Sequence, residues 1–256
     1  MARLTIVADK AAMSETAADR VASLVETAIA ARGVAALSLT GGSTPDLLYA
    51  LLADPKRPWR QRIDWGRMHL FWGDEREVPP DHPESNYGLA HRWLLQHVQL
   101  PETQVHRMRG ELPASDAGRL YDAVLRARRD QTVGPLFDVM LLGIGENAHI
   151  ASIFPGSPLL ASSADPSGPR QPLAAGVFVP ELGTWRITMT PPALLDSTAI
   201  IMIAAEASKT GAIAAAIEGP LDVPRYPAQL LRNAGDRVEW IIDSAAAARL
   251  RDARRG

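Results

Sequence analysis

A histidine beside two glycines is the residue of this sequence best placed to move a proton. The segment Gly143-Ile144-Gly145-Glu146-Asn147-Ala148-His149 directly follows an apolar run of strand length, Val139–Leu142. An imidazole changes charge near neutral pH, and a turn at the end of a strand would aim His149 into a cleft. A buried structural histidine is the alternative, and the segment alone leaves both roles open.

The same segment fits the loose G-x-G-x-x-A fingerprint of a dinucleotide-binding turn. Such a turn needs a full helix directly after it, whereas Pro155-Gly156 would end a helix within two turns. The acidic residue expected about 20 positions on, Asp165, lies in a Ser/Pro/Gly-rich stretch, 162–172, that we predict to be a surface loop. We therefore reject a dinucleotide site.

A second candidate segment is a glycine pair, Thr40-Gly41-Gly42-Ser43-Thr44-Pro45. It lies between a predicted strand and a short helix that starts near Pro45, for which Thr44 is the predicted cap. Glycines let the backbone approach a ligand, and the N–H groups of a helix start favour an anion. A phosphate cradle and an ordinary strand-to-helix turn are equally consistent with the segment. The Lys-Ser/Thr pair of a P-loop is missing.

A third candidate is the charged segment Asp74-Glu75-Arg76, which follows the predicted strand Met68–Trp72. Its composition favours a solvated turn, but its place at a strand end favours a binding role. Arg76 could hold a phosphate through two hydrogen bonds, while Asp74 could position the arginine or accept sugar hydroxyls. Further on, Ser85 or Asn86 is a predicted helix cap, and Asn86 is a candidate ligand contact.

Two more basic residues follow strand-like runs. Lys209 lies in the predicted first turn of an alanine-rich helix that runs to Glu218, where a cation opposes the helix dipole. That unfavourable placement points to an anionic ligand, although a surface lysine is the commoner explanation. Arg186, at the start of the predicted strand Arg186–Thr190, is a weaker candidate of the same kind.

These segments share one structural context, because each follows an apolar run in a chain of alternating strand and helix patterns. Such alternation predicts an α/β fold: an open, mostly parallel sheet with helices on both faces, in a single domain over residues 1–256. In such sheets the ligand site lies outside the carboxyl ends of the strands, so the segments should meet at one edge. The expected elements are a helix from about Ser14 to Ala31 ended by Gly33, and strands at 4–8, 35–40, Met68–Trp72, Val139–Leu142, Ile200–Ala204 and Val238–Ile242.

Composition narrows the function classes. The formal charge of −2 provides no general attraction for nucleic acid or an anionic membrane, so anion binding must be local. The chain has no cysteine, its six histidines lack metal-ligand spacing, and no uncharged apolar run reaches about 18 residues. We expect a cytoplasmic protein, a monomer or small homo-oligomer, with a metal-free site for a small molecule.

The candidate segments, taken in order, resemble the motifs of the 6-phosphogluconolactonase family. The resemblance implies a flavodoxin- or Rossmann-like domain that needs no cofactor and hydrolyses 6-phosphoglucono-1,5-lactone in the oxidative pentose phosphate pathway. It assigns the water-activating base to His149, and phosphate or substrate binding to Gly41, Gly42, Ser43, Arg76, Arg186 and Lys209. The segments that carry it are 39–45, 73–76, 82–87, 143–149, 154–156, 186–190 and 206–209.

The sequence departs from the family pattern beside the base. The family usually has Gly-x-Asp-Gly-His, whereas this chain has Glu146-Asn147-Ala148-His149. Asn147 can orient the histidine by hydrogen bonding but cannot itself stabilise an imidazolium with negative charge. Ala148 carries a β-carbon, which disfavours positive φ.

Two alternatives remain open. The 143–151 segment is also similar to glucosamine-6-phosphate deaminases, but those have Phe-Asn-Glu-Pro after the histidine and Asp-Glu-Tyr at the earlier motif. This chain has Ser152-Ile153-Phe154-Pro155 and Asp74-Glu75-Arg76, which favours the lactonase. A non-catalytic sugar-phosphate sensor is the other alternative. Such regulators usually carry a DNA-binding segment, and the first strand here is predicted to begin at Leu4.

Overall fold

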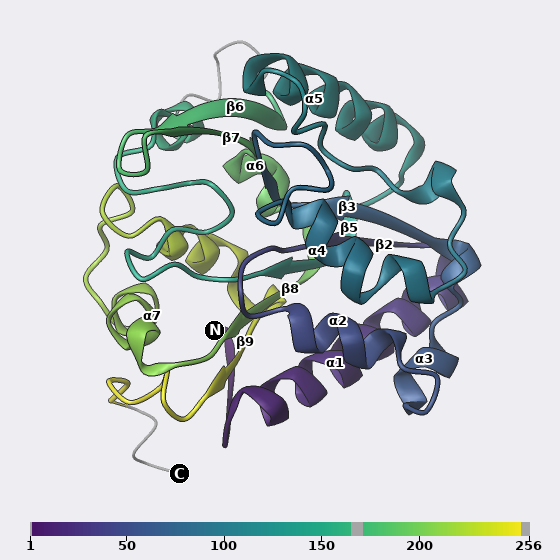
Figure 1. The fold of residues 1–256 in the computed structure, drawn as a ribbon. Helices are drawn as coiled ribbons and strands as arrows, with labels where there is room; N and C mark the ends of the chain where they lie inside the picture. The colour runs from purple at the N-terminus through teal and green to yellow at the C-terminus, as the bar shows by residue number, and fades with distance from the viewer. Residues whose placement is uncertain (1, 165–170, 252–256) are drawn as a thin grey trace.

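Six parallel strands form the central sheet of the computed structural model, which describes residues 2–164 and 171–251 (Figure 1). Every pair of neighbouring strands is parallel, so the predicted mostly parallel α/β sheet is confirmed. In spatial order the strands are β1 (Arg3–Val7), β9 (Val238–Asp243), β8 (Ser197–Ala204), β5 (Phe137–Leu142), β2 (Ala35–Leu39) and β3 (Met68–Trp72).

Helices cover both faces of this sheet, as predicted. One face packs against α1 (Lys10–Arg32), α2 (Asp46–Ala53), α3 (Pro58–Arg62) and α4 (Asn86–Trp93). The other face packs against α5 (Ala114–Gln131), α6 (Pro191–Leu194), α7 (Thr210–Ile217) and the 3-10 segment η6 (Pro227–Arg237). Short 3-10 turns complete the connections: η1 (Trp65–Arg67), η2 (Leu95–His97), η3 (Glu102–Gln104), η4 (Pro158–Ala164) and η5 (Ala207–Lys209).

Strand β8 shows how the sequence specifies two cores. Successive side chains of a strand point to opposite faces. Ile201 and Ile203 accordingly join the core under α1, while Ile200 and Met202 join the opposite core. All four are fully buried, which explains why the strand reads as a continuous apolar run. Burial of each side chain contributes about 1.5–3 kcal/mol.

Helix α1 matches the prediction at its end and begins earlier than predicted. Gly33 ends it in the left-handed conformation, with φ of 79° and its N–H donating to the Ile29 carbonyl. The helix begins at Lys10 because the Asp9 carboxylate accepts from the Ala12 N–H at 2.9 Å. Capping thus adds a turn that the apolar spacing alone does not reveal.

A second, smaller sheet was not predicted. It pairs β4 (Asp74–Arg76), β7 (Thr184–Met189) and β6 (Ala174–Val179) in antiparallel order, and Figure 1 shows β6 and β7 beside α5. The predicted strand Arg186–Thr190 belongs to this sheet as part of β7, which begins two residues earlier at Thr184, and Arg186 pairs with Arg76. The prediction missed β4 because three charged residues do not form a strand-like pattern.

Three further predictions concern a helix cap, a surface loop and membrane-spanning segments. Thr44 does not cap α2: Pro45 precedes the first helical residue, and no side chain makes a capping hydrogen bond there. The predicted loop 162–172, with Asp165, lies partly outside the described residues, which omit 165–170. Among the described residues, no helix is both long and apolar enough to cross a membrane.

Candidate active site

The predicted site residues meet at the carboxyl edge of the sheet, around two adjoining cavities of about 360 and 170 Å³. The two cavities share Asp74, Arg76, His149 and Lys209 in their walls. Asn147 and Arg186 line the larger one, whereas Asn86 and the glycine loop 41–43 line the smaller one. The residues proposed from the sequence as catalytic or substrate-binding therefore all line these two cavities.

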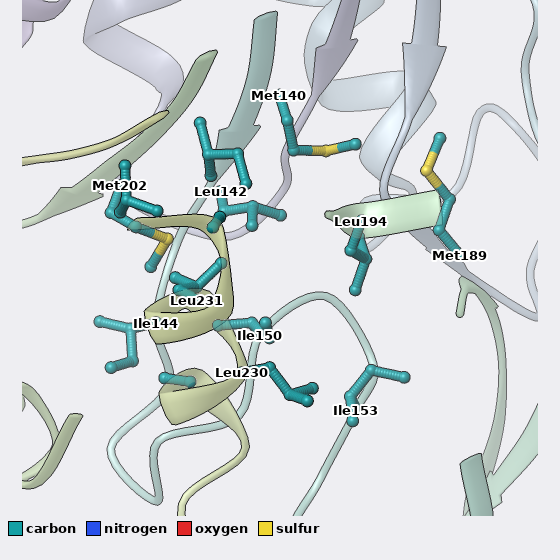
Figure 2. Packing of buried hydrophobic residues seen from close by; sticks show 14 of the residues in the cluster. Met140, Leu142, Ile144, Ile150, Ile153, Met189, Leu194, Met202, Leu230 and Leu231 are labelled. Carbon is teal, nitrogen blue, oxygen red and sulfur yellow. The ribbon is translucent and has the colours of Figure 1, made fainter. Parts of the chain in front are cut away.

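A tight loop after β5 positions His149. The Gly145 N–H donates to the His149 carbonyl at 2.9 Å, and the Ala148 N–H donates to the Gly145 carbonyl at 3.0 Å. Figure 2 shows Ile144 and Ile150, on either side of the loop, packed near Leu230 and Leu231 of η6. The buried isoleucines anchor both ends of the loop, so the backbone under His149 is fixed by the core.

The imidazole stacks on an aromatic ring and closely approaches a glycine. Phe154 stacks on it with ring centroids 4.0 Å apart and an interplanar angle of 13°. A β-carbon at Gly145 would lie 2.0 Å from the Nδ1 and Cε1 atoms of His149. Glycine at 145 is therefore required by the close approach of the ring.

Asn147 fixes which ring nitrogen carries the proton. Its Oδ1 lies 2.7 Å from His149 Nδ1 and also accepts from the His149 backbone N–H at 3.3 Å. An amide oxygen can only accept, so Nδ1 must be the protonated nitrogen of the neutral ring. The lone pair on Nε2 is then available to accept a proton.

His149 is neutral at pH 7 because of its surroundings. Burial lowers its pKa to about 4, and the positive charges of Lys209, Arg76 and Arg186 act in the same direction. A histidine that is neutral at physiological pH can act as a base, whereas an imidazolium cannot.

Three cations converge on the cavity. Register pairing places Arg76 beside Arg186 across β4 and β7, and burial, with the nearby charge of Arg76, lowers the pKa of Arg186. Arg76 donates to the Glu84 carbonyl, and Arg186 donates to Thr184 Oγ1 at 3.0 Å. Within the described ranges, neither arginine nor Lys209 lies within 4.0 Å of a carboxylate oxygen. The carboxylates of Asp74, Glu84 and Glu75 act on Arg186 from a longer distance, but none of them forms an ion pair with the three cations. Convergent cations without a paired carboxylate favour an anionic ligand.

Asp74 and Asn86 form a buried pair in the wall of the smaller cavity. Asn86 Nδ2 donates to the Asp74 carbonyl at 2.9 Å and to Asp74 Oδ1 at 3.1 Å, while Ser152 Oγ donates to Asp74 Oδ2 at 2.6 Å. A β-carbon at Gly41 would lie 1.7 Å from Asn86 Oδ1. Asn86 thus supports the glycine loop directly, and it is only 2% exposed.

The composition-based reading of Asp74-Glu75-Arg76 as a solvated turn is wrong. Glu75 is 2% exposed and accepts from the backbone N–H groups of Arg76, Asn86 and Tyr87 at 2.7–2.8 Å. It caps the start of α4 together with Ser85, whose hydroxyl accepts from the Gly88 N–H, as predicted for this position. Charge content alone could not show that backbone donors would satisfy a buried carboxylate.

Phe154 and Glu181 are among the cavity residues that sequence reasoning missed. Phe154 stood in a quoted motif without a role, and Glu181 belongs to no segment considered. Glu181 reaches the site from the β6–β7 connection, which the missed second sheet defines. Among the described residues, no three His, Asp or Glu side chains are grouped as metal ligands.

The fold and this cavity define an α/β protein with an anion-favouring site and a neutral histidine at the carboxyl edge of its sheet. The chain belongs to the family of glucosamine-6-phosphate isomerases and 6-phosphogluconolactonases, whose model matches residues 8–240.

Three similar proteins illustrate the relationship. The 6-phosphogluconolactonase of Mycobacterium tuberculosis is 37% identical over 257 residues, covering 96% of this chain and 98% of that protein. The 6-phosphogluconolactonase of Synechocystis is 33% identical over 253 residues, covering 97% of this chain and 98% of its own. The solved structure of 6-phosphogluconolactonase from Trypanosoma cruzi superposes with a TM-score of 0.80 at 26% identity, covering 98% of this chain and 97% of that one.

The contact between Gly145 and the imidazole generates a prediction about stability. Gly145→Ala should lower the free energy of unfolding by about 1–3 kcal/mol, because the new methyl group must displace the His149 ring. Gly143→Ala is the matched control, since its β-carbon would approach nothing closer than Thr40 Oγ1 at 3.9 Å. The denaturant concentration at the midpoint of unfolding reports the stability of both variants. Equal midpoints for the two would contradict the packing described for His149.

Proposed function

We propose that this chain hydrolyses 6-phosphoglucono-1,5-lactone to 6-phosphogluconate, the reaction of a carboxylic ester hydrolase. The observation that carries the proposal is a neutral histidine and three cations without carboxylate partners, all facing the same cavity. The names of relatives at 33–37% identity over nearly the full chain support the same reaction. A place in the oxidative pentose phosphate pathway and a cytoplasmic location belong to this proposal.

Hydrolysis begins with the proposed binding of the phosphate among Arg76, Arg186 and Lys209, near the glycine loop. This remote contact fixes the position of the lactone ring, so binding energy is used to orient the reacting carbonyl. His149 Nε2 then removes a proton from water, and the hydroxide oxygen bonds to the lactone carbonyl carbon. Nearby backbone N–H groups or a cation stabilise the oxyanion that forms.

The intermediate collapses by breaking the bond between the carbonyl carbon and the ring oxygen. The His149 imidazolium returns its proton to that oxygen, which becomes a hydroxyl group. One water is consumed, and the products are a carboxylic acid and the regenerated base. The carboxylic acid ionises at neutral pH.

The low pKa of His149 fits this sequence of events. A base with a pKa of about 4 is weak in the free protein. A bound phosphate would offset the charges of Lys209, Arg76 and Arg186, which removes part of the cause of the low pKa. The base is therefore strengthened when substrate is present.

His149→Gln tests the base. We expect kcat to fall by about 100-fold or more, because a general base contributes roughly 10²–10⁴-fold. Acid release from the lactone, corrected for spontaneous hydrolysis, measures the rate. The control is His97→Gln, which alters an exposed histidine away from the cavity.

Three results would contradict the proposed function. His149→Gln could retain the wild-type rate, which would remove the histidine from the mechanism. The protein could release ammonia from glucosamine 6-phosphate and show no lactone hydrolysis, as a deaminase would. It could also bind sugar phosphate without turnover, as a sensor would.

Lys209→Ala tests the phosphate site. The KM for the phosphorylated lactone should rise by about 10-fold or more, since a hydrogen bond to a charged group is worth about 1.5–3 kcal/mol. Glucono-1,5-lactone, which lacks the phosphate, provides the matched control because its KM should be insensitive to the substitution. The exposed Lys56→Ala is a second control. An equal rise in KM for both lactones would remove Lys209 from the phosphate site.

A further inference from the structure

The amide of Asn147 can present either a hydrogen-bond acceptor or a donor to His149, whereas a carboxylate at this position could present only an acceptor. A carboxylate can only accept hydrogen bonds, so it always selects the Nδ1–H form of a neighbouring histidine. An amide has one end that accepts and one that donates. If the amide of Asn147 turned over, its Nδ2 would face His149 Nδ1, and the proton of the neutral ring would move to Nε2. The base nitrogen would then have no lone pair to offer.

The structure holds the amide in one orientation from both ends. Oδ1 faces His149, where it accepts from the ring at 2.7 Å and from the backbone N–H at 3.3 Å. Nδ2 faces Glu181 and donates to its Oε2 at 2.8 Å. Turning the amide over would place Oδ1 against the carboxylate, where two acceptors would meet. Glu181 thus favours the same orientation as the backbone donor, through an independent contact.

The β6–β7 turn brings Glu181 to the cavity. The Leu182 N–H donates to the Val179 carbonyl at 3.1 Å, and the Gly183 N–H donates to the Pro180 carbonyl at 3.2 Å. Glu181 and Leu182 both line the larger cavity. This turn is 34 residues from Asn147 in the sequence, so the contact exists only because the second sheet packs against the site.

We propose that Glu181 is a positioning residue that acts through Asn147: its carboxylate holds the amide so that His149 keeps its proton on Nδ1 and presents Nε2 to water. The inference rests on the proposed lactonase function. The Glu181 carboxylate also supplies the negative charge that Asn147 lacks. When His149 becomes an imidazolium, Asn147 Oδ1 accepts from its Nδ1–H, and the carboxylate on the far side polarises the amide in the stabilising direction.

The experiment combines two readouts on Glu181→Ala. The ¹⁵N chemical shifts of the His149 ring at pH 7 report the tautomer, and steady-state kinetics report its consequence. We expect the ring to move from the Nδ1–H form towards the Nε2–H form, and kcat to fall by about 10-fold, with KM for the lactone changed far less. Glu146→Ala, which removes the same charge from the same cavity wall, should leave the ¹⁵N shifts unchanged.

Testing Glu181→Ala in the Asn147→Asp variant distinguishes a positioning role of Glu181 from a general role in stabilising the structure. In Asn147→Asp, the carboxylate at 147 selects the Nδ1–H form without help, so adding Glu181→Ala should cost no further kcat. An equal loss of kcat in both backgrounds, or an unchanged tautomer in Glu181→Ala, would overturn the proposal. Should Glu181→Ala fail to fold, Glu181→Gln keeps the side-chain size. Its amide can donate or accept, so it should give an intermediate tautomer ratio and kcat.

The two readouts also separate this inference from the proposed function. If the wild-type protein does not hydrolyse the lactone, the proposed function fails. The ¹⁵N shifts of His149 in the wild type and in Glu181→Ala then still decide whether Glu181 sets the tautomer.

Discussion

The parallel alignment of the central strands is the constraint on which the site depends. Because β2, β3, β5 and β8 all run in one direction, the segments that follow them emerge at one edge of the sheet. Those segments carry the glycine loop, Arg76, His149 and Lys209. The small antiparallel sheet then closes one side of the cavity and adds Arg186 and Glu181.

The sequence predicts those elements whose pattern of apolar residues lies within one short segment. The predicted strand Met68–Trp72 is observed as β3 with the same bounds. A short, mostly apolar run of this length is typical of a buried strand. The gathering of the site residues is also predictable, since it follows from the strand ends alone. The small sheet is not predictable in this way: β4 contains Asp74, Glu75 and Arg76, and its partners lie more than 100 residues away. Glu181 was missed for the same reason, since only tertiary contacts bring it to Asn147.

The departures from the family pattern prove to be accommodated by their surroundings. Ala148 adopts a left-handed φ of 64°, a conformation that costs a residue with a β-carbon about 1–2 kcal/mol. Its side chain is fully buried in the core, and the Ala228 N–H donates to its carbonyl at 2.9 Å. Packing and this hydrogen bond offset the strain. Asn147, in turn, has a carboxylate within hydrogen-bond distance on the side away from His149.

Burial and three nearby cations lower the pKa of His149 in the free protein, and a bound anion should raise that pKa part of the way back, so that the ring stays neutral at pH 7 and becomes a stronger base. The most direct test is an NMR titration of the His149 ring in the free protein and with the product, 6-phosphogluconate, bound. We expect a pKa of about 4 in the free protein and a higher pKa in the complex, because the bound phosphate offsets the charges of the cations. A pKa near the ordinary value of about 6.5 in the free protein, unchanged by the product, would contradict it.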